Sequence, residues 1–379
     1  MRKSAGFTIG PRQTLVALAA ATLLVGCAQH DTTAPPTRSA PEDAARAMLA
    51  SSTPLVGFPI DLALNAHSCR AKDYRDFDFW LGQWDARFTN NGVLGGTDSV
   101  ASRLDGCAVE ERWTDGGRGR SLNTFDQSLG QWTQFWVYSG GGAFTPLLLQ
   151  GGFKNGVMRM RYDRTSETGV FQPFPPPGAT LFAATDDYIW FAEPGGQSII
   201  QRDSTAFNGR AESLSFEFRY NRVAAVTPIP VSPTSICQTR SQNHQFDFML
   251  GRWKIYASPA RLLSLGETRF GLDLGDCLME EHVDAPGNYA GWSFNSWSLF
   301  TQQWHRTYVD NLGHRVALAG GLTNGDMILS GTQATLFGPM MIRVTWHPVS
   351  PSEVRQTWEA SFTRGASWPL RYSFTLAKQ

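Results

Sequence analysis

The stretch DFDFWLGQWDAR (Asp76–Arg87) returns 169 positions later as QFDFMLGRWKIY (Gln245–Tyr256). Three further segments of the first half return in the same order in the second half, at offsets between 169 and 172. These pairs are GCAVEERW (106–113) with DCLMEEHV (276–283), GRSLNTFDQSLGQW (119–132) with GWSFNSWSLFTQQW (291–304), and GGFKNGVMRM (151–160) with GGLTNGDMIL (320–329). An offset that varies so little indicates an internal duplication with few gaps.

The duplication predicts two domains of about 150 residues, and a domain of that size can bury a core of its own. We place the first domain at residues 67–222 and the second at residues 237–379. The segment between them, 223–236, has the Pro-rich composition of a semi-rigid linker. Residues 28–66 are rich in Ala, Ser, Thr and Pro, and we expect a flexible tether there with a short helix around 44–50.

The composition favours an all-β protein. The chain contains 37 Gly and 13 Trp, and 12% of its residues are aromatic. Glycine supplies the positive φ angles of tight turns, and aromatic side chains pack well on pleated surfaces. Lys and Arg total 33, as do Asp and Glu, so the net charge is zero. This balance argues against a nucleic-acid partner and against charge-driven binding to an anionic membrane.

Within each copy the apolar residues alternate with period two, as in TQFWVYS, SLSFEFRY, RVALAG and MIRVTW. Asn-Gly pairs begin at residues 91, 155, 208 and 324, and this pair suits type I′ hairpin turns. Eight or more such strands with little room for helices predict an antiparallel meander. We expect each meander to close into a barrel, because closure removes exposed strand edges.

The N-terminus has the features of an export signal. A basic start at Arg2 and Lys3 precedes a short apolar run that ends in LVGC at Cys27. This pattern resembles the lipobox of bacterial lipoproteins, which implies removal of residues 1–27 up to a lipidated Cys27. Ala28 after the cysteine then implies the outer membrane, facing the periplasm, with membrane contact through the anchor only. The alternative is an ordinary secretory signal with an incidental cysteine.

The opening phrase is too short for a full helix, so FDFWLG predicts one tight turn that caps a barrel end. The Gly-x-Trp that follows resembles the first strand of lipocalins and the wider calycin group. That resemblance implies a Trp packed under an Arg of the last strand, which closes the barrel. The residues concerned are Gly82, Trp84 and Arg219 in the first copy and Gly251, Trp253 and Arg371 in the second. These roles are structural.

More narrowly, the series FDFWLGxW, GCxxEE, GxSxN and GG…NGxM resembles a bacterial family of lipocalin-like proteins known as domain of unknown function 1579. The resemblance covers both domains from about residue 74 onward, apart from an insertion, FQPFPPPGAT (171–180), in the first copy. The first copy also departs near its end, where SIIQRDSTAF stands for EVRQTWEASF. The family implies two tandem antiparallel lipocalin-like barrels and no activity.

Four cysteines besides Cys27 follow the repeat. Four cysteines allow three disulfide pairings, and only one works identically in both copies. We therefore predict the bonds Cys69–Cys107 and Cys237–Cys277, each stabilising by roughly 3–4 kcal/mol in the chain-entropy model. A zinc site is the rival, although the spacing contains no CxxC pair.

Each copy places two adjacent acids on one strand. Alternation puts Glu111 on the face of Val109 and Trp113, and Glu281 on the face of Met279 and Val283. We expect these carboxylates inside the barrels, where each could hold a cationic ligand group or act as an acid or base. Equally, they could be buried hydrogen-bond acceptors that tie strands together.

The next strand carries alternating polar residues. Ser121 and Asn123, and in the second copy Ser293 and Asn295, would join the glutamates if the two strands pair as a hairpin. The sequence thus predicts a polar patch among aromatic walls, as in a ligand pocket. Trp136 and Tyr308 extend the predicted ligand-binding set, although such aromatic rows also form ordinary barrel walls. A satisfied core network is the alternative for the whole patch.

Recognisable catalytic and cofactor motifs are absent. The chain has no phosphate-binding Gly-Lys-Ser/Thr loop, no HExxH and no GxSxG. We predict no cofactor and no metal; the alternative is a haem site in the second domain, built on His282, His305, His314 or His347. The sequence leaves the oligomeric state open.

These observations favour an envelope lipoprotein that binds a small, mostly apolar molecule in one or both barrels. One alternative is an enzyme, a hydratase, isomerase or hydrolase of a lipid-like or isoprenoid substrate, with Glu111 or Glu281 as acid or base. Another is an interaction scaffold with filled barrels.

Overall fold

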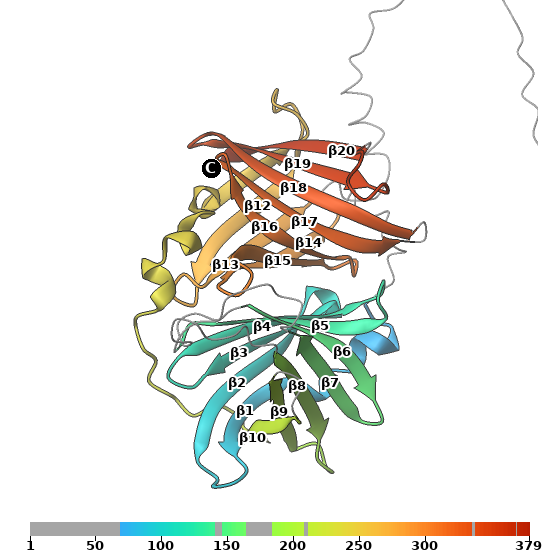
Figure 1. Cartoon of the computed structure of the whole chain (residues 1–379). Coiled ribbons are helices and arrows are strands. Elements are labelled where there is room, and N and C mark those ends of the chain that lie inside the picture. Colours follow the sequence, from blue (N-terminus) through green and yellow to red (C-terminus); the bar gives the residue numbers. More distant parts are fainter. Residues whose placement is uncertain (1–68, 141–145, 164–183, 208–210, 336–337, 369) are drawn as a thin grey trace, which may run out of the picture.

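The computed structural model describes residues 69–140, 146–163, 184–207, 211–335, 338–368 and 370–379. Over these residues the chain forms two closed antiparallel barrels of ten strands each, arranged in tandem (Figure 1). The predicted all-β class with two tandem barrels is confirmed. The expected signal peptide, Cys27, the tether and its short helix, and the insertion 171–180 all lie outside the described residues.

Each barrel is a simple meander in which every strand pairs with the next and the last strand returns to the first. The strands of barrel 1 are β1 (Gly82–Phe88), β2 (Leu94–Arg103), β3 (Ala108–Thr114), β4 (Arg118–Asp126), β5 (Gln131–Tyr138), β6 (Leu147–Lys154), β7 (Val157–Asp163), β8 (Ala184–Ala192), β9 (Ser198–Phe207) and β10 (Ser213–Arg222). Those of barrel 2 are β11 (Gly251–Tyr256), β12 (Ser264–Asp273), β13 (Leu278–Ala285), β14 (Tyr289–Ser298), β15 (Gln303–Asp310), β16 (Arg315–Thr323), β17 (Asp326–Thr335), β18 (Gly338–Ser350), β19 (Glu353–Ser361) and β20 (Leu370–Lys378). Ten strands encircle each barrel, against the eight of lipocalins.

The repeated opening phrase forms a single 3₁₀ turn at one end of each barrel, η3 (Asp78–Trp80) and η8 (Asp247–Met249). The indole of Trp84 donates a 2.8 Å hydrogen bond to the Trp80 carbonyl, which connects the first strand to this turn. Gly82 has a φ of 146°, a backbone conformation that favours glycine at this point. The sequence prediction of a turn that caps a barrel end agrees with this arrangement.

The arginine predicted to cover the first-strand tryptophan was misassigned. Arg222, not Arg219, lies over Trp84, with its guanidinium carbon 4.2 Å from the ring centroid. Side chains alternate along β10, and the neighbours Phe218 and Tyr220 are buried, so Arg219 is carried to the outer face. There it pairs with Glu193 at 2.8 Å and is about half exposed.

The corresponding cation in barrel 2 also differs from the prediction. The ammonium of Lys378 lies 5.3 Å from the Trp253 ring, since Lys378 pairs with Trp253 in the register of β11 and β20. Arg371 lies opposite Glu359, near the other end of β20. A cation on the last strand does cover each tryptophan, but it comes from the strand's final residues.

Two of the four Asn-Gly pairs make the predicted left-handed turns. Asn155 and Gly156 have φ angles of 53° and 82°, and Asn324 and Gly325 have 51° and 90°. At residues 91 and 92 only the glycine has a positive φ, because a longer loop joins β1 to β2. The pair at residue 208 lies outside the described residues.

Both predicted disulfides are present. Cys69 is bonded to Cys107, and Cys237 to Cys277, with Cα–Cα distances of 4.9 and 5.1 Å. Each bond ties the segment before the opening turn to the residue just before the glutamate-bearing strand. The zinc alternative is wrong, because all four sulfur atoms are committed to disulfides.

The two barrels pack against each other along the walls that contain β3–β5 and β13–β15 (Figure 1). Phe135 of one barrel meets Phe294 of the other within a buried apolar cluster that draws residues from both. Arg120, only 4% exposed, crosses this interface: it bonds Glu110 at 2.5 Å within its own barrel, and Asp273 at 2.8 Å and Glu280 in the other. Although burial opposes it, hydrogen bonds from His282 and Arg120 lower the pKa of Glu280 to about 2.

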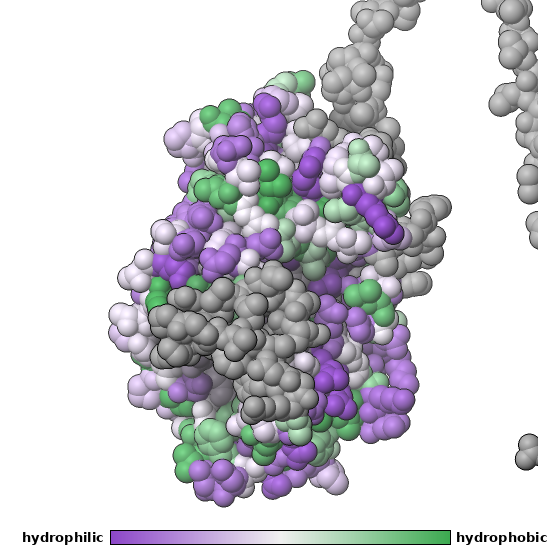
Figure 2. Space-filling view, viewed as in Figure 1, coloured by the Kyte–Doolittle hydropathy of each residue, from purple (hydrophilic) through white to green (hydrophobic). Residues whose placement is uncertain are grey.

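The linker between the two barrels contacts barrel 1, where Thr227 donates two hydrogen bonds to Asp85. On the face drawn in Figure 2, hydrophilic and hydrophobic residues are interspersed over both barrels. Among the described residues, no helix is both long and apolar enough to cross a membrane.

Candidate functional site

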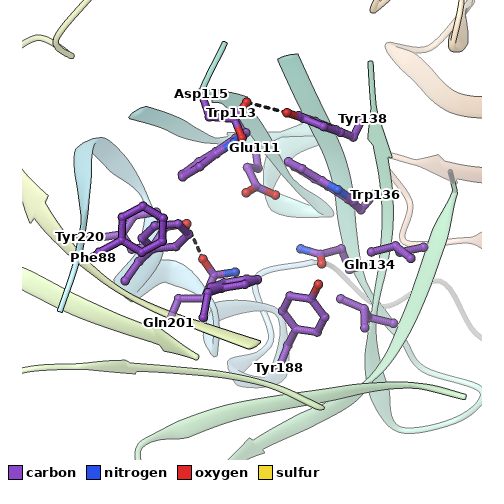
Figure 3. Close-up of a pocket in the computed structure, with 14 residues that line it drawn as sticks. Phe88, Glu111, Trp113, Asp115, Gln134, Trp136, Tyr138, Tyr188, Gln201 and Tyr220 are labelled. Carbon is purple, nitrogen blue, oxygen red and sulfur yellow. Dashed lines mark hydrogen bonds between the residues drawn. The ribbon is translucent and has the colours of Figure 1, made fainter. Parts of the chain in front are cut away.

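Barrel 1 contains a cavity of about 340 Å³ (Figure 3). Strands from around the whole barrel contribute to it, and most of its wall is aromatic or aliphatic. The lining residues are Phe88, Glu111, Trp113, Asp115, Gln134, Trp136, Tyr138, Leu147, Leu149, Tyr188, Gln201, Phe216, Phe218 and Tyr220. A few polar groups set in apolar walls are typical of small-molecule sites.

Glu111 is the buried carboxyl group among the residues that line this cavity. It lies on β3, pairs in register with Ser121 on β4, and points into the open space in Figure 3. The Ser121 hydroxyl donates a 2.6 Å hydrogen bond to its Oε2. Burial raises the pKa of Glu111 to about 8, and the bond from Ser121 only partly opposes this rise. At neutral pH the group is therefore mostly protonated in the free protein.

A second carboxyl group, Asp98 on β2, lies beside Glu111. Val100 pairs with Glu111 and Asp98 with Trp113, so the two acids are diagonal neighbours on the inner face. Asp98 is 1% exposed, and neither of its oxygens has a hydrogen-bond partner of good geometry. Burial first and the charge of Glu111 second raise its pKa well above 3.8, although the nearby backbone amides of Ser99 and Arg112 favour the charged form.

Behind Glu111 runs a chain of amide and hydroxyl groups. Asn123 donates through Nδ2 to the Ser121 hydroxyl at 2.7 Å and to the Val109 carbonyl at 2.9 Å. Gln134 on β5 in turn donates to the Asn123 Oδ1 at 2.8 Å. The chain is neutral throughout, so it orients the Glu111 carboxyl without supplying a positive charge.

Two phenols with hydrogen-bonded hydroxyl groups also line the cavity. The Tyr220 hydroxyl donates to Gln201, and burial together with the nearby Asp98 and Glu111 raises the pKa of Tyr220 well above 10. Tyr138 donates to Asp115 at 2.7 Å, and burial and this hydrogen bond likewise raise its pKa. Both phenols therefore stay protonated and act as hydrogen-bond donors.

The equivalent glutamate in barrel 2 has a different environment. Glu281 accepts a 2.5 Å bond from Arg306, and the two side chains are 5% and 1% exposed. It also accepts bonds from Ser293 and Thr268, each at 3.1 Å. Arg306 further donates to the Asn295 Oδ1 at 3.1 Å. The polar patch predicted from the sequence thus forms in both barrels, but in barrel 2 an arginine neutralises it.

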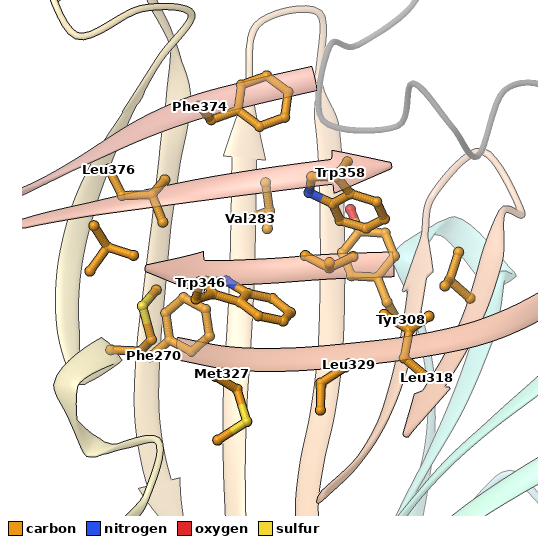
Figure 4. Close-up of a cluster of buried hydrophobic side chains, with 14 of the residues drawn as sticks. Phe270, Val283, Tyr308, Leu318, Met327, Leu329, Trp346, Trp358, Phe374 and Leu376 are labelled. Carbon is orange, nitrogen blue, oxygen red and sulfur yellow. The ribbon is translucent and has the colours of Figure 1, made fainter. Parts of the chain in front are cut away.

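Barrel 2 is also filled with bulky side chains (Figure 4). Trp358 pairs with Val344 on β18, at the position where barrel 1 has Asp203 paired with Tyr188. Tyr289 stands where barrel 1 has Gly117, since each lies four residues before the patch serine on its strand. At both positions the side chain in barrel 2 is larger than its counterpart in barrel 1.

Tyr308, predicted to bind ligand, is 2% exposed and hydrogen-bonded to Tyr289. Tyr289 also reaches Asp310, and Asp310 pairs with His314 at 2.9 Å. Tyr308 is thus part of a buried network.

The four histidines considered for a haem site contact four different partners. His282 stacks on Trp292, His305 bonds Thr301, His314 pairs with Asp310 and His347 pairs with Asp326. The described residues contain no cluster of three or more His, Cys, Asp and Glu suited to a metal ion.

Of the predicted ligand-binding residues in barrel 1, Glu111 and Trp136 line the cavity, while Ser121 and Asn123 support Glu111 from behind. Sequence reasoning missed Asp98 and most of the remaining wall. Comparison of the two copies could have indicated them. Asp98 corresponds to Thr268 and Gln134 to Arg306, so at both inward-facing positions one copy has a charged residue and the other a neutral one.

The described residues thus form two tandem ten-stranded barrels, one with a cavity of about 340 Å³ and one with a large buried apolar cluster in its interior. No family model matches the chain, and no curated protein matches it. A solved structure of an unknown-function protein of the DUF3598 family from Nostoc punctiforme PCC 73102 is similar at 11% identity and a TM-score of 0.22, covering 82% of this chain and 100% of that one. A family 43 glycoside hydrolase, YxiA from Bacillus licheniformis, is similar at 12% identity and a TM-score of 0.14, covering 64% and 67%. Similarities this weak carry no argument about function.

Proposed function

We propose that the protein binds a small, mostly apolar molecule in the cavity of barrel 1. The observation that carries this proposal is a cavity of about 340 Å³ with mostly aromatic walls, into which the buried carboxyl group of Glu111 points. Barrel 2, with its interior occupied by Trp346, Trp358 and their neighbours, acts as a rigid partner that buries one wall of barrel 1. The scaffold alternative therefore applies to barrel 2.

Native mass spectrometry of protein purified without heating tests this proposal, because a bound molecule adds a stoichiometric mass. Leu147 lies on the cavity wall, and Leu147→Trp should fill the space and remove the added mass. Leu129→Trp, in an exposed turn where the leucine is 51% accessible, is the matched control and should leave it unchanged. A ligand that survives Leu147→Trp argues against the cavity as its site.

Catalysis is the second candidate, and the raised pKa of Glu111 is the observation that favours it. A carboxyl group that titrates near pH 8 can donate and accept a proton under neutral conditions. In this version Glu111 is the acid or base acting on a lipid-like substrate, and Glu281 is excluded by its ion pair with Arg306. If turnover of a substrate disappears in Glu111→Gln while the substrate still binds, catalysis is favoured over simple ligand binding.

The proposal includes the cellular location inferred from the sequence, in which the protein is a bacterial envelope lipoprotein lipidated at Cys27. It also includes the relation to the lipocalin-like proteins. Metabolic labelling with a fatty-acid analogue tests the anchor. Label incorporated by the native chain and absent from Cys27→Ser supports it, whereas equal labelling of both contradicts it.

A further inference from the structure

We propose that the ligand of barrel 1 carries a protonated amine or guanidinium on an apolar body, and that this cation pairs with Glu111, with Asp98 behind it as the second carboxyl. The inference rests on the proposed function, because it names the chemical class of the cavity's ligand. It is carried by the charge balance of the two barrels, which can be compared position by position.

Barrel 1 buries two neighbouring acids without a base. Asp98 and Glu111 are 1% and 4% exposed, and neither makes an ion pair among the described residues. No Lys, Arg or His is among the cavity-lining residues that the structure describes. A buried carboxylate is costly unless a positive charge or several hydrogen bonds compensate it. The two oxygens of Asp98 make no hydrogen bond of good geometry, and only the nearby backbone amides of Ser99 and Arg112 favour its charged form.

Barrel 2 supplies the missing charge from its own chain. Arg306 pairs with Asn295 in the strand register as Gln134 pairs with Asn123, so these two residues are structural equivalents. Arg306 reaches Glu281 and Ser293, the counterparts of Glu111 and Ser121. The neutral Gln134 cannot do this, and Asp98 adds an acid where barrel 2 has the neutral Thr268. The same framework of strands therefore pairs its buried glutamate with an arginine in barrel 2 and leaves two buried acids without a base in barrel 1.

The position in barrel 1 that corresponds to Arg306 of barrel 2 faces the cavity. Gln134 itself lines the cavity, beside Glu111 and Trp136. A ligand cation in front of Glu111 would thus occupy the region that corresponds to the guanidinium of Arg306. Aromatic side chains surround that region in both barrels: Arg306 lies 5.5 Å from the Tyr308 ring, and Trp136 is the counterpart of Tyr308. Such rings favour a cation through their π faces.

Binding of a cation is coupled to loss of a proton. Burial raises the pKa of Glu111 to about 8, so a ligand cation must displace a proton from Glu111 to form the ion pair at neutral pH. The other titratable groups that face Glu111 are Tyr220 on β10 and Tyr188 on β8, with Asp115 and Tyr138 at the end of β3 and β5. Asp186 and Asp203, further along β8 and β9, are buried acids as well. Affinity for the cation therefore rises with pH up to about 8.

Two probes with the same body and different head groups test the inference: 2-(1-naphthyl)ethylamine and 2-(1-naphthyl)ethanol, titrated calorimetrically into the purified protein. The amine has a basicity like that of lysine and stays protonated at pH 6.5 and 8.5. At pH 8.5 we expect it to bind at least roughly tenfold more tightly than the alcohol. At pH 6.5 this preference should fall by roughly twentyfold, and proton release should make the heat depend on the buffer.

Two variants locate the cation. Glu111→Gln removes the negative charge at constant shape and should abolish the preference for the amine while the alcohol still binds. Gln134→Arg supplies the cation from within, as barrel 2 does, and should do the same. Leu129→Gln, in the exposed turn, is the control with unchanged preference. Near-ultraviolet circular dichroism checks the fold; if Gln134→Arg does not fold, Glu111→Gln alone decides.

The outcomes separate the inference from the proposed function. Equal binding of both probes refutes the inference and leaves an apolar binding site standing. A preference for the amine that persists in Glu111→Gln also refutes it, because the cation must then lie elsewhere. Failure of both probes to bind contradicts the inference and the proposed function together.

Discussion

Replacing Glu111 by glutamine should stabilise the protein, and by more at high pH than at low pH. The carboxyl group is 4% exposed, and burial raises its pKa from an ordinary 4.5 to about 8. Because the folded state holds the proton more tightly than the unfolded state, stability falls as pH rises from 4.5 towards 8. The full difference in pKa corresponds to about 5 kcal/mol, most of it developed above pH 5.5.

Glutamine has the same shape and no charge to bury, so it escapes this cost. At pH 8.5 we expect Glu111→Gln to raise the free energy of unfolding by about 3–5 kcal/mol, and at pH 5.5 by about 1 kcal/mol. Glu281→Gln is the matched change in barrel 2. It leaves Arg306 buried without its carboxylate, so it should lower stability by about 3–5 kcal/mol at both pH values.

Urea denaturation followed by tryptophan fluorescence at the two pH values measures these differences. Both barrels contain buried tryptophans, so calorimetry should accompany it to assign each transition to a barrel. The reasoning is refuted if Glu111→Gln destabilises barrel 1 at pH 8.5, or if its effect is the same at both pH values. It is also refuted if the two glutamate variants shift stability in the same direction.

Three further predictions concern stability. Arg306→Met should lower the free energy of unfolding by about 3–5 kcal/mol, because it leaves the buried Glu281 carboxylate without its ion-pair partner. A denaturation midpoint equal to that of the native chain would contradict this. Arg120→Met, which breaks the buried contacts between barrels, should cost about 3 kcal/mol in the same measurement, whereas the half-exposed Arg118→Met should cost less than about 0.5 kcal/mol. Replacing Cys237 and Cys277 by alanine opens a link of sequence separation 40 and should cost about 4 kcal/mol; a calorimetric midpoint for barrel 2 that does not move would show the bond to be dispensable.

The duplication has produced two barrels with one polar framework and different interiors. Glutamate, serine and asparagine recur with the same register in both, and in each the asparagine donates to the serine and to a backbone carbonyl. What changed is the residue that pairs with the asparagine from the following strand, arginine in barrel 2 and glutamine in barrel 1. That exchange, with Asp98 in place of Thr268, makes barrel 1 the copy with an uncompensated charge.

Sequence patterns were sufficient wherever a property depends on local order along the chain. Period-two alternation predicted the strands and the inward side of Glu111, since successive side chains of a strand point to opposite faces. The matched spacing of cysteines in two copies predicted both disulfides. The same alternation, followed along β10, would have rejected Arg219 and pointed to Arg222, which shares the face of Phe218 and Tyr220.

Tertiary structure alone decided which barrel is hollow and which carboxyl is unpaired. Free volume depends on side chains from many strands at once: barrel 1 keeps a cavity of about 340 Å³, while barrel 2 packs Trp346, Trp358 and their neighbours into one buried cluster. The pKa of Glu111 depends on burial and on the hydrogen bond from Ser121, and neither is a property of its own strand. Strand order and register can be inferred from a repeating pattern, but the packing and the charge balance of an interior are sums over residues distant in sequence.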